Sequence, residues 1–84
     1  MTDNKIEVLA RVTDLWRDID GGWSENGASV TEHVFVFDAD ASDAKISRTI
    51  RNHFGMGSGW KRDDWSGSDF SWRSGCMGCY ADVI

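Results

Sequence analysis

Two cysteines near the end of the chain have the spacing of a metal or dithiol motif. Cys76 and Cys79 are separated by two residues, as in half of a zinc site or in a redox-active dithiol. A redox dithiol sits at a helix N-terminus that lowers the thiol pKa, and the short segment after Cys79 leaves no room for that helix. Zinc would need two more ligands, and His33 and His53 are far apart in sequence. We expect no cofactor and cysteines that act as small core residues, and we keep a small zinc-stabilised structural protein as an alternative.

The remaining residues indicate no catalytic arrangement. The serines lie outside any G-x-S-x-G motif, and the two histidines border phenylalanines, which favours the rim of a core over a role as general bases. Three spaced glycines, Gly55, Gly57 and Gly59, follow a segment predicted to be helical, whereas phosphate-binding glycines link a strand to the start of a helix. We therefore predict a protein that is not an enzyme.

Carboxylates gather beside tryptophans in the first third of the chain. The acidic group consists of Asp14, Asp18, Asp20 and Glu25, and Trp16 and Trp23 lie among them. Such a surface can occupy a basic groove built for nucleic-acid phosphates, with tryptophan as the buried anchor. The same oxygens could bind Ca²⁺, but their spacing does not match that of an EF-hand loop. The pattern favours docking on a basic protein surface.

Charge is unevenly distributed along the chain. Residues 1–43 carry a net charge of −7 and residues 44–84 a net charge of +2, which together make the overall −5. General nucleic-acid binding depends on a surplus of Lys and Arg, so the balance argues against it. Complementary charge orients protein partners, although ordinary solvated surface would explain the asymmetry equally well.

Basic residues in the second half form the alternative candidate site. Three of them recur along one flank of the predicted helix and two lie in the following loop: Lys45, Arg48, Arg51, Lys61 and Arg62. With Trp60 and Trp65 beside them, they could contact phosphates and stack on bases. Asp63 and Asp64 weaken that field, and cations late in a helix are also explained by the helix dipole. A small nucleic-acid-binding protein is therefore the second hypothesis.

The chain has the length of a single domain, residues 1–84. Polar and apolar residues alternate from Lys5, which predicts a half-buried strand; Ile6, Val8, Ala10 and Val12 lie on one side, and Glu7, Arg11 and Thr13 on the other. Residues 18–29 contain Gly21-Gly22 and Asn26-Gly27 and are expected to form a long hairpin connection. Val30 to Asp38 predicts the antiparallel second strand, and its Val34-Phe-Val-Phe run indicates burial on both faces.

The second half predicts a helix and a hairpin. A helix from 42 to 54 would carry Ile46, Ile50 and Phe54 on one stripe and end at Gly55. The glycine-rich residues 55–67 form a loop, and residues 69–73 and 79–84 pair around Ser74-Gly75 or Met77-Gly78. The predicted fold is α+β, an antiparallel sheet with one helix packed on it, in the order ββαββ.

Five tryptophans are more than so small a core can bury. Some must therefore lie partly at the surface, where tryptophan is a common interface anchor. We predict that Trp23, Trp60 and Trp65 belong to the interface.

The chain lacks the run of about 20 apolar residues that a membrane span requires. Its N-terminal residues, Met1 to Lys5, lack the basic and apolar regions of a signal peptide. We expect a cytoplasmic protein with reduced cysteines and no membrane contact.

The chain resembles small acidic proteins of phages and mobile elements, anti-CRISPR proteins among them. The resemblance rests on the single α+β domain, the surface aromatics, the lack of a catalytic motif and the acidic segment Asp18-Ile-Asp-Gly-Gly-Trp-Ser-Glu-Asn-Gly27. The resemblance implies a stoichiometric inhibitor in the bacterial host's cytoplasm. Such an inhibitor docks on a CRISPR effector subunit or another host protein and blocks nucleic-acid binding or nuclease recruitment. No site residue carries over from a family. A structural component of a virion is a further alternative, and the residues leave the target and the oligomeric state open.

Overall fold

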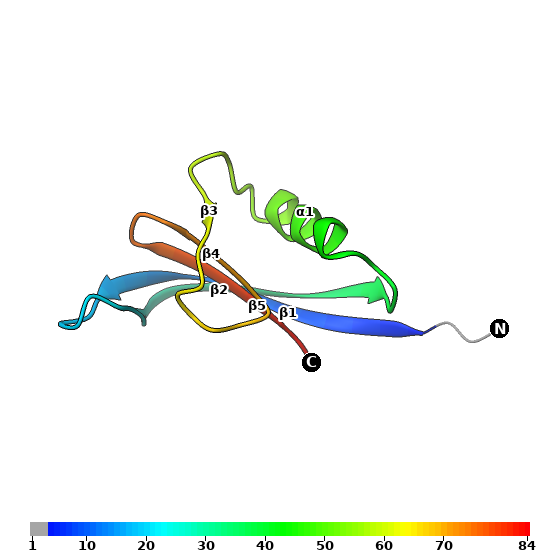
Figure 1. The fold of residues 1–84 in the computed structure, drawn as a ribbon, viewed down its shortest axis with the longest axis horizontal. Coiled ribbons are helices and arrows are strands. Elements are labelled where there is room, and N and C mark those ends of the chain that lie inside the picture. Colours follow the sequence, from blue (N-terminus) through cyan, green and yellow to red (C-terminus); the bar gives the residue numbers. More distant parts are fainter. Residues whose placement is uncertain (1–3) are drawn as a thin grey trace.

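A computed structural model describes residues 4–84, in which an antiparallel sheet carries one helix on one of its faces (Figure 1). The elements are β1 (Lys5–Arg17), β2 (Trp23–Asp38), α1 (Asp43–His53), β3 (Lys61–Arg62), β4 (Phe70–Ser74) and β5 (Met77–Val83). Across the sheet the strands lie in the order β2-β1-β5-β4-β3, each antiparallel to its neighbour. The predicted α+β class is confirmed. The predicted order ββαββ lacks β3, whose two residues are too few to produce an alternating pattern in the sequence.

The predicted strand over Val30–Asp38 is confirmed and is antiparallel to β1, but the predicted long connection over residues 18–29 is wrong. β2 already begins at Trp23, and the turn is confined to Asp18–Gly22, where the Asp18 N–H donates to the Gly22 carbonyl over 2.8 Å. Residues 1–3, the first part of the segment predicted to lack signal-peptide character, lie outside the described residues.

The Asn26-Gly27 pair forms an irregularity inside β2 instead of a turn. The pairing of β1 with β2 shifts from Thr13 opposite Val30 to Leu15 opposite Glu25, so β2 contains extra residues opposite Asp14. Gly27 has a φ of 73°, which side-chain-bearing residues rarely adopt. Gly21-Gly22 and Asn26-Gly27 are both typical turn sequences, and only the pairing of the strands shows which of them forms the turn and which forms the bulge.

The helix matches its prediction closely. Ser42 is the N-cap, and its hydroxyl accepts a hydrogen bond from the Lys45 N–H over 3.1 Å. Ile46 and Ile50 are buried against the sheet, and Gly55 follows the C-cap with a φ of 64°. These local signals determine both ends of the helix.

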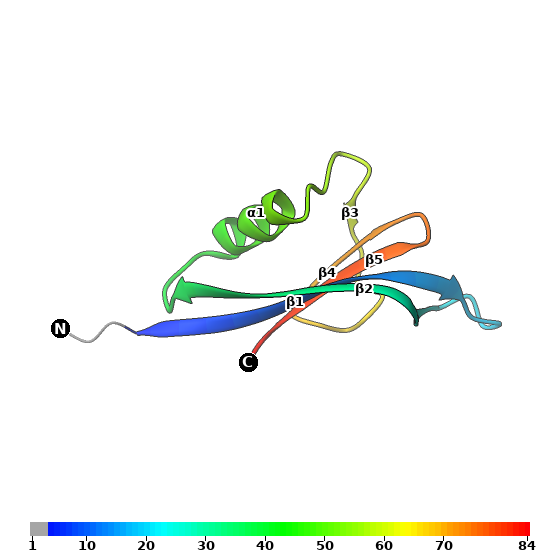
Figure 2. The ribbon, with the colours of Figure 1, turned by 180° about the vertical axis from the view of Figure 1, so that it is seen from behind.

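We call the side of the sheet that packs on α1 the helix face, and it holds the main core (Figure 2). The strands contribute every second residue to this core: Val8, Ala10, Phe35, Phe37, Phe70, Trp72, Cys79 and Ala81. These side chains pack against Ile46 and Ile50 of α1 and against Met56. The prediction that residues 34–37 are buried on both faces is wrong. Phe35 and Phe37 point into the core, whereas Val34 and Val36 are 46% and 61% exposed, because no element within residues 4–84 covers the other side of β2 there.

The opposite side of the sheet, which we call the loop face, is covered by chain instead of helix. After β3 the segment 63–69 passes around the sheet edge and crosses this face (Figure 1). A Cβ on Gly78 of β5 would come within 2.6 Å of the Trp65 ring and 2.7 Å of Leu15, so the ring rests directly on the β5 backbone. Thr13, predicted on the polar side of its strand, lies on this face and is fully buried.

The last two strands form the predicted hairpin. Ser74 pairs with Met77, so the turn is Gly75-Cys76, next to one of the two positions expected from the sequence. Figure 1 shows that the β1–β2 hairpin extends past this turn at one end of the sheet. The end of the long hairpin is therefore left without a covering element.

Candidate protein-binding surface

The end of the β1–β2 hairpin exposes two large apolar side chains. Trp16, near the end of β1, is 60% exposed, and Ile19, in the turn itself, is fully exposed. The surrounding residues in this turn are glycines and aspartates, which offer no apolar surface to cover them. Isolated exposed apolar residues are common, but here a tryptophan and an isoleucine lie three residues apart and are both uncovered at one end of the hairpin.

Three of the predicted carboxylates surround these apolar side chains. Asp14 and Trp16 are two residues apart on β1 and therefore lie on the same side of the sheet, and Ser24 of β2 pairs with Trp16. The Asp18 carboxylate accepts the Ser24 hydroxyl over 2.7 Å, which holds it on that side. Asp20 accepts the Gly22 N–H over 3.0 Å and shapes the turn. We call Asp14, Trp16, Asp18, Ile19 and Asp20 the tip surface.

None of the three carboxylates of the tip surface takes part in a salt bridge within residues 4–84. Salt bridges among residues 4–84 involve other carboxylates, those of Asp38, Glu25, Glu32 and Asp63. The hydrogen bonds of Asp18 and Asp20 come from a hydroxyl and an amide, which orient the carboxylates without neutralising them. A basic partner therefore meets charges that are already positioned.

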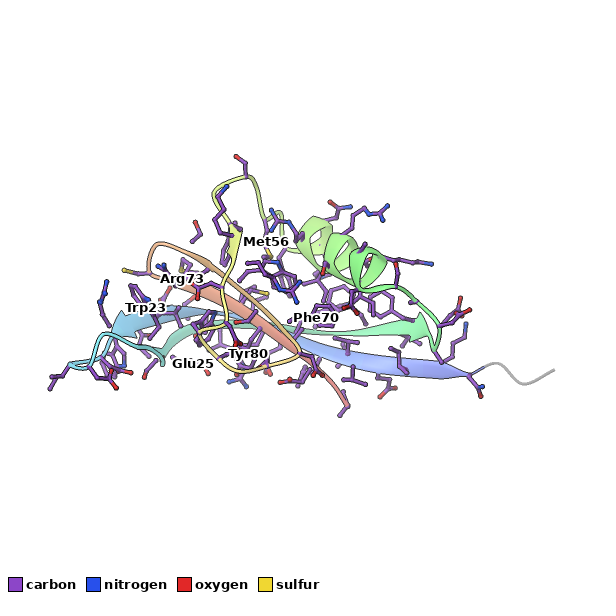
Figure 3. The ribbon with its side chains drawn as sticks, viewed as in Figure 1. Trp23, Glu25, Met56, Phe70, Arg73 and Tyr80 are labelled. Atoms are coloured by element: carbon purple, nitrogen blue, oxygen red, sulfur yellow. The ribbon has the colours of Figure 1, made fainter. Side chains whose placement is uncertain are left out.

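Glu25, the fourth predicted carboxylate, belongs to a different environment. It accepts a hydrogen bond from Arg11 over 2.9 Å and one from the Tyr80 hydroxyl over 3.1 Å on the loop face (Figure 3). Glu32 binds the same guanidinium over 2.9 Å, and the two carboxylates raise the pKa of Arg11. Burial and the bond to Glu25 raise the pKa of Tyr80. Glu25 holds strands together, and its charge is not available to a partner.

The three tryptophans predicted for the interface are each packed within the domain. Trp23 is contacted by Arg17 and Arg73, whose guanidinium carbons are 5.4 and 4.5 Å from its ring centre. The Trp65 indole N–H donates to the Trp72 carbonyl over 2.8 Å, and Trp60 packs against the main core. The most exposed tryptophan is Trp16, which the interface prediction did not include. Ile19 was not among the predicted site residues either, and an apolar residue inside an Asp/Gly turn is the sequence signal that could have identified this end of the hairpin.

The basic residues of the alternative site do not form one free patch. Arg51 donates to the Gly57 and Trp60 carbonyls over 3.1 and 3.3 Å and so fixes the loop after the helix. The Arg62 guanidinium lies 5.3 and 5.4 Å from the Phe70 and Trp72 ring centres. Only Lys45, Arg48 and Lys61 of the set are exposed without such packing.

The prediction that the cysteines act as small core residues is confirmed for Cys79 and wrong for Cys76, because Cys76 lies in a turn at the end of the sheet. Cys76 is exposed in the β4–β5 turn, whereas Cys79 is buried in the core, where desolvation raises the pKa of its thiol to about 12. No group of three potential metal ligands occurs within residues 4–84. His33 and His53, separated in sequence, stack with ring centres 4.1 Å apart where the end of α1 lies over β2, at the edge of the phenylalanine cluster.

Comparison with protein-family models, with curated proteins and with solved structures finds no match to this chain. In the described part of the chain, no helix has the length and apolar character needed to cross a membrane.

Proposed function

We propose that this protein is a non-enzymatic, protein-binding inhibitor that docks through the tip surface on a basic groove of its partner. The observation that carries the proposal is the exposed Trp16 and Ile19 at a projecting hairpin end, accompanied by three carboxylates that form no salt bridge within residues 4–84. Aromatic anchors in the middle of an interface supply much of its affinity, and surrounding charge supplies orientation and association rate.

The shape of the hairpin supports insertion into a concave partner. Its end reaches past the β4–β5 turn, so Ile19 and Trp16 can enter a groove before the body of the domain meets the rim (Figure 2). Grooves lined with Lys and Arg occur where proteins hold nucleic-acid phosphates. A carboxylate-bearing hairpin in such a groove excludes the nucleic acid by competition.

The resemblance to anti-CRISPR proteins points to the class of partner. A CRISPR effector subunit holds nucleic acid in a positively charged channel. We propose that the tip surface occupies such a channel, or the nuclease-recruiting surface beside it, in a host effector.

The proposal is tested by capture with matched variants. The tagged protein is incubated with nuclease-treated lysate of a bacterium with active CRISPR systems, and bound effector subunits are identified by mass spectrometry. The test variants are Trp16→Ala and the triple amide Asp14→Asn, Asp18→Asn, Asp20→Asn, in which the amide oxygens can still accept the Ser24 and Gly22 hydrogen bonds. The affinity of the captured subunit is then measured at low and high salt.

The matched control removes the same amount of charge elsewhere. Glu7→Gln, Asp40→Asn and Asp64→Asn change three exposed carboxylates far from the hairpin end. We expect Trp16→Ala to weaken binding about thirtyfold or more, the triple amide to slow association in a salt-dependent way, and the control to bind normally. Equal capture by all variants, or co-purification of nucleic acid alone, would overturn the proposal.

A further inference from the structure

The two edges of the sheet differ in how well they are protected against pairing with another strand. The β3 edge is two residues long, and both residues, Lys61 and Arg62, are basic and exposed. Short, charged edges resist the addition of a further strand. The β2 edge is 16 residues long, and its stretch Val30-Thr-Glu-His-Val-Phe-Val-Phe37 contains no Lys, Arg, Pro or Gly. This stretch is a regular strand with an open outer side (Figure 2).

The backbone groups that face outward from β2 can be identified from its pairing with β1. The Ile84 N–H donates to the Glu7 carbonyl on the β5 side of β1, and the Ala39 N–H donates to the Asn4 carbonyl on the β2 side. Since these directions alternate along an antiparallel strand, even-numbered residues of β1 face β2. Their partners on β2 are Phe37, Phe35 and His33. The even-numbered residues of β2, centred on Val34, therefore direct their N–H and C=O groups away from the sheet.

The side chains of the same residues form an apolar strip on the loop face. Val30, Val34 and Val36 are exposed, and Leu9 of β1, which pairs with Val34, is exposed beside them. The Trp65 ring covers Gly78 and Leu15 and leaves these valines and Leu9 exposed. Open hydrogen-bonding groups and apolar side chains thus coincide on one edge.

The edge is electrically neutral, unlike the tip surface. Glu32 is bound by Arg11 over 2.9 Å, and Asp38 is bound by Lys5. The other side chains between Val30 and Asp38 carry no formal charge when His33 is neutral. The edge therefore neither attracts a basic partner nor repels an identical, acidic chain.

We propose that β2 pairs antiparallel with β2 of a second copy of this chain, around a twofold axis at Val34, so that the two sheets become continuous. Val34 then faces Val34 of the second copy, Glu32 faces Val36, and Val30 faces Asp38, so no like charges lie opposite each other. The regular segment Val30–Asp38 is centred on Val34, so this register pairs all of it. The apolar strips join across the axis, and the two hairpin ends point in opposite directions, which makes the dimer bivalent.

The test is a charge swap at the axis, with mass measured by sedimentation equilibrium from micromolar to millimolar concentrations. Wild type is expected to dimerise. Val34→Lys and Val34→Glu each place like charges opposite each other, and we expect each to weaken dimerisation at least tenfold. An equimolar mixture of the two variants is expected to restore the dimer. Val34 is 46% exposed in the monomer, so both variants can fold, and circular dichroism verifies this.

Two further variants test the register and the location. Val36→Lys adds the same charge two residues away but faces Glu32 of the second copy, so it is expected to retain or strengthen the dimer. Val83→Lys changes a valine of equal exposure, 46%, on β5, two strands away from the edge, and is expected to dimerise normally.

A monomeric wild type at millimolar concentration, a dimer unaffected by Val34→Lys, or a failed rescue in the mixture would each overturn the proposal. A wild type that stays monomeric but binds a strand-forming peptide at this edge would assign the edge to a foreign partner and overturn it too. The readout is mass alone, so it is independent of whether the tip surface binds an effector.

Discussion

The helix face and the loop face of the same sheet are closed by different means. On the helix face, α1 buries Ile46 and Ile50 against large apolar side chains, including Phe35, Phe37 and Trp72. On the loop face, one ring, Trp65, rests on a glycine, and a polar group of Arg11, Glu25 and Tyr80 continues the cover toward β2. The first closure depends on buried area, and the second depends on close fit and hydrogen-bond geometry.

The difference explains which parts of the sheet remain exposed. A helix covers a long stretch of strand, whereas a loop held by one tryptophan covers only the part beneath it. Beyond Trp65 the loop face remains open at Leu9 and Val34, and beyond α1 the hairpin end remains open at Trp16. Both proposed interaction surfaces lie where these two covers stop.

The largest effect is expected from the helix face. Ile50 is completely buried between α1 and the sheet, so Ile50→Ala leaves a cavity and should lower the free energy of unfolding by about 4 kcal/mol. Urea denaturation followed by circular dichroism measures it. Ile84→Ala, which changes an exposed isoleucine after β5 and outside the β2 edge, serves as the control and should change stability by less than about 0.5 kcal/mol. Similar losses for both would mean that α1 does not form the main core.

The loop face should be most sensitive at its glycine. Gly78→Ala places a methyl group 2.6 Å from Trp65 and 2.7 Å from Leu15, and we expect a loss of about 2 kcal/mol as the ring moves away. Gly57→Ala is the matched control, because its Cβ would meet nothing within 4 Å and its φ is not positive, so stability should change little. A neutral Gly78→Ala would show that Trp65 does not pack on β5.

Cys79 makes the helix face sensitive to alkaline pH. Burial raises the pKa of its thiol from 9.0 to about 12, so above pH 9 the unfolded chain loses a proton that the folded chain keeps. The stabilisation is complete below pH 9 and declines above it, approaching about 1.4 kcal/mol per pH unit before levelling near pH 12. Thermal or urea unfolding between pH 9 and 10 should show a flatter dependence for Cys79→Ala. Cys76→Ser, which changes the exposed cysteine, should leave the wild-type dependence intact, and an unchanged slope in Cys79→Ala would contradict the burial.

The smallest effect is expected from the polar cover. Tyr80→Phe removes the hydroxyl that donates to Glu25 over 3.1 Å, at a half-buried site, and should cost about 1 kcal/mol. The same variant should bind a tip-surface partner with unchanged affinity, because Glu25 is not part of that surface. A loss of partner binding without a loss of stability would return Glu25 to the interface.

Local signals in the sequence determined the helix and the location of the first two strands. The cap at Ser42, the stripe of Ile46 and Ile50, and Gly55 determine the helix, since these interactions lie within a few residues of one another. Alternation determines the strands from Lys5 and from Val30 in the same way. The acidic group at the first hairpin was also correctly located, apart from Glu25.

Tertiary structure decided the rest, because pairing partners far apart in sequence leave no local trace. Whether Gly21-Gly22 or Asn26-Gly27 forms the turn depends on the register of β1 against β2. The exposure of Val34, the burial of Thr13 and the engagement of Glu25 by Arg11 and Tyr80 depend on where Trp65 and the loop cross the sheet. Trp16 is the exposed tryptophan in place of the predicted Trp23, because Arg73 packs on the Trp23 ring. Arg73 lies 50 positions along the chain from Trp23, so the sequence contains no local sign of this contact.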